Sequence, residues 1–323
     1  MTRGPNGGRT VRTEALAAVL MGQVALAACA EQGTPIDTLL HGSSTGIIAF
    51  NSTVDGGIVL IDPTTGRKAL LTKGASPEWS SNGRELSFMR AGRIYVIGAN
   101  GTNEREIPVA PFLFEVPYLV RPVLSPGADR IAYSRQGEIE LVDLGGGKPV
   151  FLMKPDPADD RMPVWSPRGE HLAFVRDGDI YVVSVDGSGL RNLTADRAED
   201  LDPEWSPTGD RIAFSSRGSD GVRIWTIRPD GSDRRRVTND EENPEHQEYH
   251  PSWSPDGTQI VFERWGGPQG RQGADIYIAS VNSGTVRPLA VTPGFDGLPS
   301  WGFPSMAAAT SGAHRGRGGP SPP

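Results

Sequence analysis

The chain is dominated by a repeated unit of 40 to 48 residues, which is clearest between Pro203 and Thr238. The unit contains four short runs in which apolar residues alternate, separated by turn-forming pairs such as Asp220-Gly221 and Asp230-Gly231. Alternation with a period of two indicates strands with two different faces, and Asp-Gly pairs favour tight hairpins. Each unit is therefore predicted to be a four-stranded antiparallel meander, copied along the chain.

One position, aromatic in all but one copy, marks the first strand of each copy and counts the copies. The aligned positions are 45, 41, 40, 48 and 48 residues apart, and they are Trp79, Leu124, Trp165, Trp205, Trp253 and Trp301. A single meander cannot bury both of its faces, whereas several meanders arranged radially bury them against one another. The spacing therefore predicts an all-β fold, a six-bladed β-propeller of four-stranded antiparallel blades.

The two ends of the repeated region are incomplete in complementary ways. Three predicted strands, at 46–50, 58–61 and 68–72, lack a first strand, while Pro299 to Trp301 resembles a first strand with nothing after it. Pairing this C-terminal strand with the three N-terminal strands would complete one blade and remove two exposed sheet edges. We therefore expect the ring to close in this way, within a propeller that spans residues 46–303.

The turn after the aromatic residue carries a recurrent Ser-Pro-x-Gly pattern, and one copy reads Pro-Ser-Trp-Ser-Pro-Asp-Gly from Pro251 to Gly257. These residues resemble the TolB-type β-propeller repeat, a WD40-like repeat of bacterial envelope proteins centred on Trp-Ser-Pro-Asp-Gly. The resemblance covers about residues 46–303 and implies a six-bladed propeller. One copy departs from the pattern, because Ala128 stands where the others have glycine. That position needs a positive φ, so we expect an altered turn from Ser125 to Asp129.

The N-terminal segment has the features of a targeting sequence. Residues 1–28 combine a basic start with a largely apolar stretch, and Leu26-Ala27-Ala28-Cys29 resembles a bacterial lipobox. Because Cys29 is the only cysteine, we predict that it is lipidated and that residues 1–28 are a lipoprotein signal peptide. The alternative is an ordinary signal peptide or a cytosolic start. Residues 29–45 are predicted to be a tether, and 304–323 a disordered low-complexity tail.

Charge and hydropathy exclude two classes of function. The net charge of −7 argues against nonspecific binding to nucleic acid, which requires a basic face. No uncharged apolar run is long enough to span a bilayer, so contact with the membrane is expected through the lipid anchor alone. The predicted localisation is the bacterial cell envelope, on its periplasmic or extracellular face. The protein is expected to be a monomer.

Acidic residues recur three positions before the proline of the repeat, namely Asp160, Asp200, Glu248 and Asp296. In a propeller this register reaches one mouth of the central channel, and His250 lies beside it. An electronegative mouth concentrates cations or basic segments of a partner, which makes these five residues the predicted binding site. Alternatively, each carboxylate accepts hydrogen bonds from the backbone of its own turn. The sequence leaves both interpretations open.

Two histidines carry an alternative hypothesis of metal binding. His246 and His250 lie near Glu245 and Glu248, and such a set could bind a divalent transition metal. Some propeller lyases that cleave acidic sugars use histidine-rich metal sites. The main expectation is nevertheless that the protein has no catalytic residue, no metal and no cofactor.

The functional expectation combines the fold, the lipid anchor and the acidic mouth. We expect a non-catalytic, lipid-anchored platform that binds envelope proteins. Two alternatives are a receptor for a small ligand or glycan and a metal-dependent lyase or hydrolase that uses His246 and His250. The receptor hypothesis also involves the apolar, proline-spaced segment from Pro108 to Pro122, which is either buried against a blade or exposed to a partner.

Overall fold

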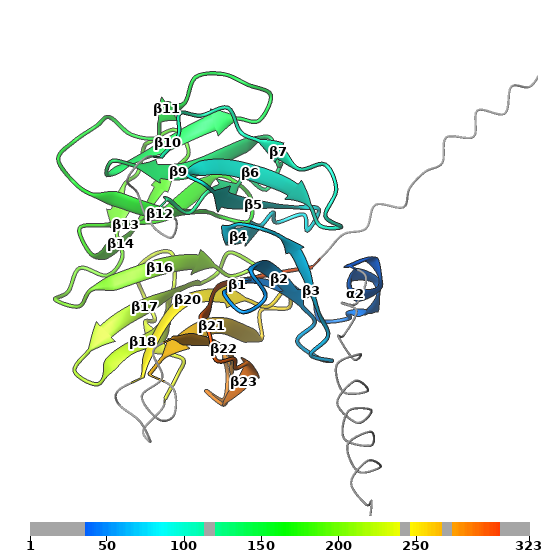
Figure 1. Cartoon of the computed structure of the whole chain (residues 1–323). Helices are drawn as coiled ribbons and strands as arrows, with labels where there is room; N and C mark the ends of the chain where they lie inside the picture. The colour runs from blue at the N-terminus through cyan, green and yellow to red at the C-terminus, as the bar shows by residue number, and fades with distance from the viewer. Residues whose placement is uncertain (1–35, 113–119, 240–245, 267–272, 304–323) are drawn as a thin grey trace, which may run out of the picture. The chain divides into compact units, whose positions relative to one another are not determined.

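The computed structural model of the protein describes residues 36–112, 120–239, 246–266 and 273–303. Within these residues the strands form six antiparallel sheets of four strands each, arranged as the blades of a ring (Figure 1). This arrangement confirms the predicted six-bladed, all-β propeller. The predicted signal peptide, Cys29 and the C-terminal tail lie outside the described residues.

Blade 1 combines both ends of the described chain. It contains β24 (Asp296–Gly302), β1 (Ile47–Ser52), β2 (Gly57–Ile61) and β3 (Lys68–Thr72). β24 pairs antiparallel with β1, so that Trp301 lies opposite Ile48 and Asp296 lies opposite Ser52. In Figure 1 the orange-red C-terminal strand lies beside the blue β1. The predicted closure of the ring is confirmed.

Each of the other five blades is one continuous segment of chain. Blade 2 contains β4 (Ala75–Trp79), β5 (Glu85–Arg90), β6 (Arg93–Gly98) and β7 (Arg105–Glu106). Blade 3 contains β8 (Val123–Leu124), β9 (Arg130–Arg135), β10 (Glu138–Asp143) and β11 (Val150–Phe151). Blade 4 contains β12 (Asp160–Trp165), β13 (His171–Arg176), β14 (Asp179–Ser184) and β15 (Arg191–Asn192).

The last two blades complete the ring. Blade 5 contains β16 (Asp200–Trp205), β17 (Ile212–Gly218), β18 (Gly221–Ile227) and β19 (Arg235–Arg236). Blade 6 contains β20 (Gln247–Trp253), β21 (Gln259–Trp265), β22 (Ala274–Ser280) and β23 (Val286–Ala290). The first strands of neighbouring blades contact one another all the way round, in the order β24, β4, β8, β12, β16 and β20. These inner strands therefore surround a central channel.

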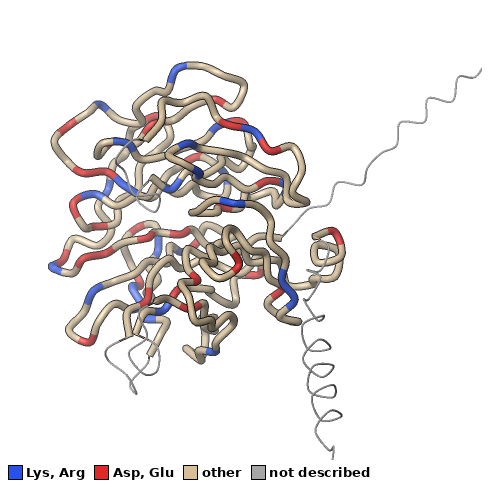
Figure 2. The backbone as a smooth tube through the Cα atoms, viewed as in Figure 1, with Lys and Arg blue, Asp and Glu red and all other residues tan. Residues whose placement is uncertain are grey.

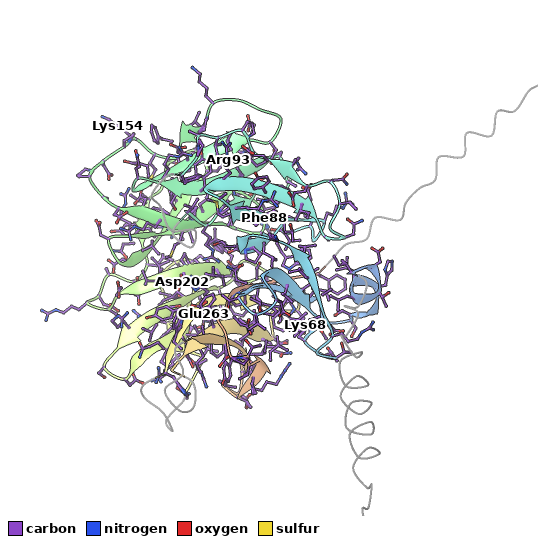
Figure 3. All side chains as sticks on the ribbon, viewed as in Figure 1. Lys68, Phe88, Arg93, Lys154, Asp202 and Glu263 are labelled. Carbon is purple, nitrogen blue, oxygen red and sulfur yellow. The ribbon has the colours of Figure 1, made fainter. Side chains whose placement is uncertain are left out.

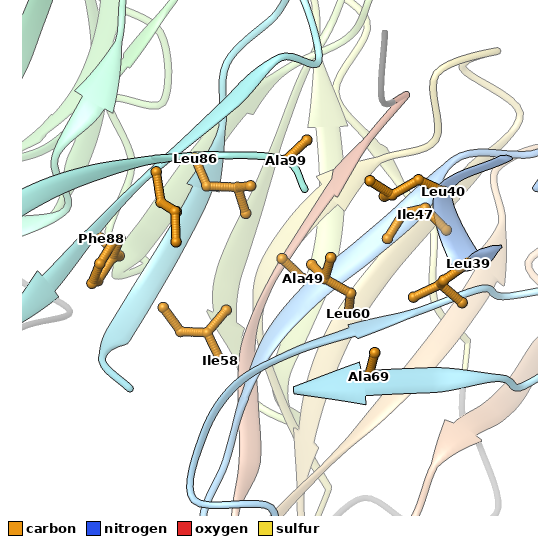
Figure 4. Packing of buried hydrophobic residues seen from close by; sticks show 11 residues of the cluster. Leu39, Leu40, Ile47, Ala49, Ile58, Leu60, Ala69, Leu86, Phe88 and Ala99 are labelled. Carbon is orange, nitrogen blue, oxygen red and sulfur yellow. The ribbon is translucent and has the colours of Figure 1, made fainter. Parts of the chain in front are cut away.

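The hydrophobic core is divided among the six interfaces between blades. Each interface has its own cluster of buried apolar side chains, for example Ile58 of blade 1 with Leu86 and Phe88 of blade 2 (Figure 4). The five other clusters join blades 2 and 3, 3 and 4, 4 and 5, 5 and 6, and 6 and 1. Because every blade is covered on both faces, apolar side chains on both faces of its strands are buried.

A short helix, α2 (Ile36–Gly42), lies within the segment that the sequence predicts to be a tether. Its Leu39 and Leu40 are buried against Ile47 and Leu60 of blade 1 (Figure 4). A seven-residue helix is too short to be stable alone, so this packing holds it in place. The described part of the predicted tether is thus docked on the propeller.

The segment from Pro108 to Pro122 is described only in part. Phe112 is buried and meets the ring of Tyr133 edge-on, with centroids 5.7 Å apart. This contact fits the interpretation that the segment covers a blade. Leu113, Phe114 and Tyr118, which the exposed-patch interpretation needs, lie outside the described residues.

The predicted alteration of the turn at Ser125 to Asp129 is wrong. The N–H of Ala128 donates to the carbonyl of Ser125 at 2.8 Å, the same bond that Gly169 makes to Ser166 in blade 4. Ala128 adopts a φ of 51°, so the alanine accepts the left-handed conformation and the turn is unchanged. The hydrogen bonds of the turn and the packing of the blade outweigh the strain at one residue.

Ala128→Gly should therefore stabilise the protein. Glycine relieves the left-handed strain, which is worth about 1–2 kcal/mol, and part of this gain is lost to greater freedom in the unfolded chain. We expect a net gain of roughly 0.5–1 kcal/mol in the free energy of unfolding. Chemical denaturation measures it, with Gly169→Ala as the reverse change at the same turn of blade 4. A destabilised Ala128→Gly variant would contradict this account.

Candidate functional site

One backbone feature recurs in every inner strand. The residue before the proline has a positive φ of 35° to 55° in all six blades, and these residues are Ser76, Arg121, Met162, Asp202, His250 and Leu298. The strand pairing shows a register shift at this point in five blades. A bulge re-aims the side chain that it carries, and at Arg121, Asp202 and His250 that side chain joins charged contacts between blades. Backbone strain of this kind clusters at functional sites.

Arg121 of blade 3 spans the channel. Its Nε donates to Glu78 of blade 2 at 2.7 Å, and its Nη2 donates to Glu204 of blade 5 at 3.0 Å. The carbonyl of Pro203 accepts a third bond from this guanidinium at 3.2 Å. Blades 3 and 5 are not neighbours, so the bond to Glu204 crosses the channel. The sequence analysis missed all three charged residues.

The three charges do not balance. One guanidinium faces two carboxylates, and all three side chains are largely buried. Burial raises the pKa of Glu204, because the Arg121 charge offsets the desolvation only in part and Glu78 adds repulsion. The pKa of Arg121 is held above its usual range by the two glutamates, despite burial. Glu204 can therefore hold a proton that a second cation in the channel would displace.

The glutamates form the floor of a funnel with a volume of about 340 Å³. Its wall and rim come from all six blades and include Trp79, Leu124, Trp165, Trp205, Trp253, Trp301, Pro167, Pro207, Pro255 and Phe303. Three of the indoles donate to backbone carbonyls, whereas the Nε1 atoms of Trp79 and Trp205 are buried without a hydrogen-bond partner. The funnel thus offers aromatic surface and carboxyl groups together.

His250 lies deeper in the channel wall, between two carboxylates. Its ring nitrogens are 3.2 Å from Oδ1 of Asp202 and 3.1 Å from Oε1 of Glu263. Asp202 and Glu263 are labelled in Figure 3, and both are buried. Burial alone would lower the pKa of His250, but the two carboxylates outweigh it and raise this pKa to about 9. The imidazolium also holds the pKa of Glu263 below its usual range against the effect of burial.

The predicted acidic mouth is built at the other end of the inner strands. Asp160, Asp200, Glu248 and Asp296 all occupy the same register, and each is at most 1% exposed. Arg176 donates to both oxygens of Asp160 at 2.6 and 2.7 Å. Arg264 donates to Glu248 at 2.6 Å, and Arg234 to Asp200 at 3.1 Å.

These arginines are themselves held by aromatic rings. Arg264 lies 4.6 Å from the ring centroid of Tyr277, and Arg234 lies 5.1 Å from those of Phe214 and Trp225. Such stacking favours a guanidinium over the ring face. Both signs of charge are therefore interspersed along the blades (Figure 2). The contacts give Asp160, Asp200 and Glu248 partners inside the fold, and their role in binding a partner stays a prediction.

The two predicted histidines have different neighbours among the described residues, and Glu245 lies outside those residues. The carbonyl of His246 accepts a hydrogen bond from Arg223, whereas His250 faces Asp202 and Glu263. Among the residues that the structure describes, no three His, Cys, Asp or Glu side chains are grouped to hold a metal ion. Nor does any helix in the described ranges have the length and hydropathy needed to cross a membrane.

The fold and the channel define the protein as a six-bladed propeller with a charged central channel. Residues 94–267 match the family model described as the TolB beta propeller domain. The match covers more than half of the 323 residues, and the chain belongs to this family. Comparison with curated proteins gives no match.

Solved structures share the fold. A putative TolB from Agrobacterium tumefaciens is 22% identical with a TM-score of 0.58, over 79% of this chain and 90% of that one. TolB from Acinetobacter baumannii is 18% identical with a TM-score of 0.63, over 79% and 66%. An oligogalacturonate lyase from Vibrio parahaemolyticus is 16% identical with a TM-score of 0.52, over 80% of each chain. At these identities the similarity shows the fold alone.

The charged His250 makes stability depend on pH. Its folded pKa of about 9 exceeds the ordinary value of 6.5, so its contribution is complete below pH 6.5 and is lost as pH rises through 9. The loss should reach about 3 kcal/mol in the free energy of unfolding. Denaturation curves between these two pH values measure it.

Two variants isolate the contribution of the histidine. His250→Gln should be less stable at the lower pH and should lose less stability over the same interval. Glu204→Gln removes the channel carboxyl group whose pKa is raised, and it should keep the loss that His250 causes. A wild-type protein with constant stability across the interval would contradict this assignment.

Proposed function

We propose that the protein is a non-catalytic binding platform of the bacterial envelope, and that a basic segment of a partner protein inserts into the funnel. The observation that carries the proposal is the floor of the funnel, where Glu78 and Glu204 share the single guanidinium of Arg121. An incoming ammonium or guanidinium group would displace the proton of Glu204 and balance the second carboxylate.

The wall of the funnel supports the same partner chemistry. Indole faces attract cations, and five tryptophans line the funnel. A volume of about 340 Å³ accommodates one or two side chains rather than a folded domain. An extended basic segment therefore fits the funnel better than a globular surface does.

The proposed localisation to the envelope rests on the N-terminal sequence. The lipobox-like Leu26-Ala27-Ala28-Cys29 supports attachment of the mature protein to a membrane by a lipid on Cys29. The propeller would then present the funnel to partners within the envelope. We propose a monomer, because the closed ring leaves each blade covered by its neighbours.

A small-ligand or glycan receptor is the second candidate, because the same funnel is aromatic and of the size of a ligand pocket. The lyase hypothesis has less support from the geometry. It requires a ring nitrogen of His250 to bind a metal, but each nitrogen lies within 3.2 Å of a carboxylate oxygen of Asp202 or Glu263.

Photo-crosslinking tests the proposed docking site. A photoreactive phenylalanine replaces Phe303 at the rim, where the side chain is 54% exposed, and a second variant carries it at Phe151, which is 52% exposed on the outer strand of blade 3. We expect a partner crosslinked from position 303 and absent from position 151. Its yield should fall about ten-fold in Glu204→Gln, because the neutral amide cannot take up the charge.

Glu199→Gln is the matched control, since it removes an exposed carboxylate that pairs with Arg217 away from the funnel. This variant should keep the full crosslink. Equal crosslinks from positions 303 and 151 would refute the docking site. Retention of the crosslink in Glu204→Gln would refute the role of charge and favour the small-ligand candidate.

Cys29→Ser tests the anchor. Without the thiol no acyl chain can be attached, so the protein should move from the membrane fraction to the soluble envelope fraction. Fractionation followed by immunoblotting measures the change, and Ser44→Ala, in the same N-terminal part of the chain, serves as the control. A membrane-bound Cys29→Ser protein would contradict lipid anchoring.

A further inference from the structure

Each carboxylate of the acidic register lies directly opposite one residue of the next strand in its blade. Asp160 is paired in register with Arg176 in blade 4, and Glu248 with Arg264 in blade 6. In both blades the arginine therefore reaches its carboxylate straight across the sheet. Blade 1 has the same register, in which Asp296 is paired with Ser52. A serine thus stands where the other two blades have the compensating cation.

Blade 5 shows that the cation can come from elsewhere. There Asp200 lies opposite Ser216, and the outer part of the blade supplies Arg234, which donates to both residues. Blade 1 has no such replacement among its described contacts. Its outer-strand Lys68 forms an ion pair with Asp55 at 2.7 Å, and the Oγ of Ser52 bonds to the same carboxylate. Among the residues that the structure describes, the blade 1 carboxylate therefore has no counter-charge.

Asp296 is fully buried, with 0% exposure, and neither of its side-chain oxygens has a hydrogen-bond partner. Two other buried carboxylates lie on blade 6 strands that contact β24, namely Glu263 and Asp275. Both have partners of their own, His250 for Glu263 and the N–H of Thr292 for Asp275. Because a buried charge without a partner is strongly disfavoured, the ionised form of Asp296 requires a positive group that the described residues do not supply.

We propose that the seam between blades 6 and 1 holds a monovalent metal cation, sodium or potassium, bound by the carboxylate of Asp296. The cation takes the position that a guanidinium occupies in blades 4, 5 and 6. It also secures the one blade that is assembled from both ends of the chain, because its main ligand lies on the closing strand β24. This inference is independent of the proposed docking function.

The choice of a monovalent ion follows from charge. One carboxylate neutralises one positive charge, whereas a divalent ion would leave an uncompensated charge in the interior. Among the described residues no group of three acidic or histidine side chains is placed to hold a metal, and divalent sites usually recruit several such ligands. Oxygen ligands suit the hard alkali cations, and neutral oxygens can complete the coordination.

Thermal unfolding of the whole mature protein tests the proposal. The probes are sodium, potassium, calcium and choline chlorides at matched ionic strength, so that general screening is constant. Sodium or potassium should raise the melting temperature by about 3 °C or more over choline, the size expected for a site well above its dissociation constant. Calcium should add nothing beyond its contribution to ionic strength.

Three variants assign the effect to Asp296. Asp296→Asn should abolish the difference between sodium and choline, whereas Asp160→Asn, which alters the paired carboxylate at the same register, should keep it. Ser52→Arg rebuilds the pairing of blades 4 and 6. It should melt in choline as the wild type does in sodium or potassium, with no further response to either ion.

A structural measurement covers the case in which Ser52→Arg does not fold. Crystals soaked in a rubidium salt should show anomalous scattering beside the carboxylate of Asp296 in the wild type and none there in Asp296→Asn. Equal melting in choline, sodium and potassium would overturn the proposal. So would an ion response that survives in Asp296→Asn, or stabilisation by calcium alone.

Discussion

The propeller depends on the antiparallel pairing of β24 with β1. This pairing supplies the fourth strand of blade 1 and removes the two sheet edges that an open array would expose. It also brings the sixth inner strand into the wall of the channel, between β20 and β4. The funnel needs that complete wall, because its lining comes from all six blades and includes Trp301 of β24. Closure of the ring therefore determines both the fold and the geometry of the site.

Most of the fold could be predicted because its signals are local and repeated. A proline, an aromatic residue and a turn recur in register, so the number of blades and the missing first strand follow from alignment of the copies. Two features escaped prediction. Helix α2 is held by packing of Leu39 and Leu40 rather than by its own sequence. Ala128 shows that the hydrogen bonds of a turn can outweigh a backbone preference that is usually reliable.

The site was harder to predict from the sequence than the fold was. The carboxylate register was found because it occupies the same position in each copy, but its arginine partners come from different strands, as Arg176 and Arg234 show. The floor of the funnel joins Arg121 to a residue 83 positions away, and no local pattern encodes that distance. One sequence signal could have identified the charged residues of the channel. The residue before each proline varies from blade to blade within an otherwise uniform strand, and Arg121, Asp202 and His250 occupy this position.

That variable position has a consequence for how such a channel can arise. Copies with identical residues before the proline would surround the axis with six equal side chains, and any charge among them would face only its own sign. The bond between His250 and Asp202, which both stand before a proline, therefore needs unlike residues in adjacent blades. Charges that compensate one another within this ring of positions can therefore arise only in a propeller whose duplicated units have diverged, while the shared backbone lets each unit change alone.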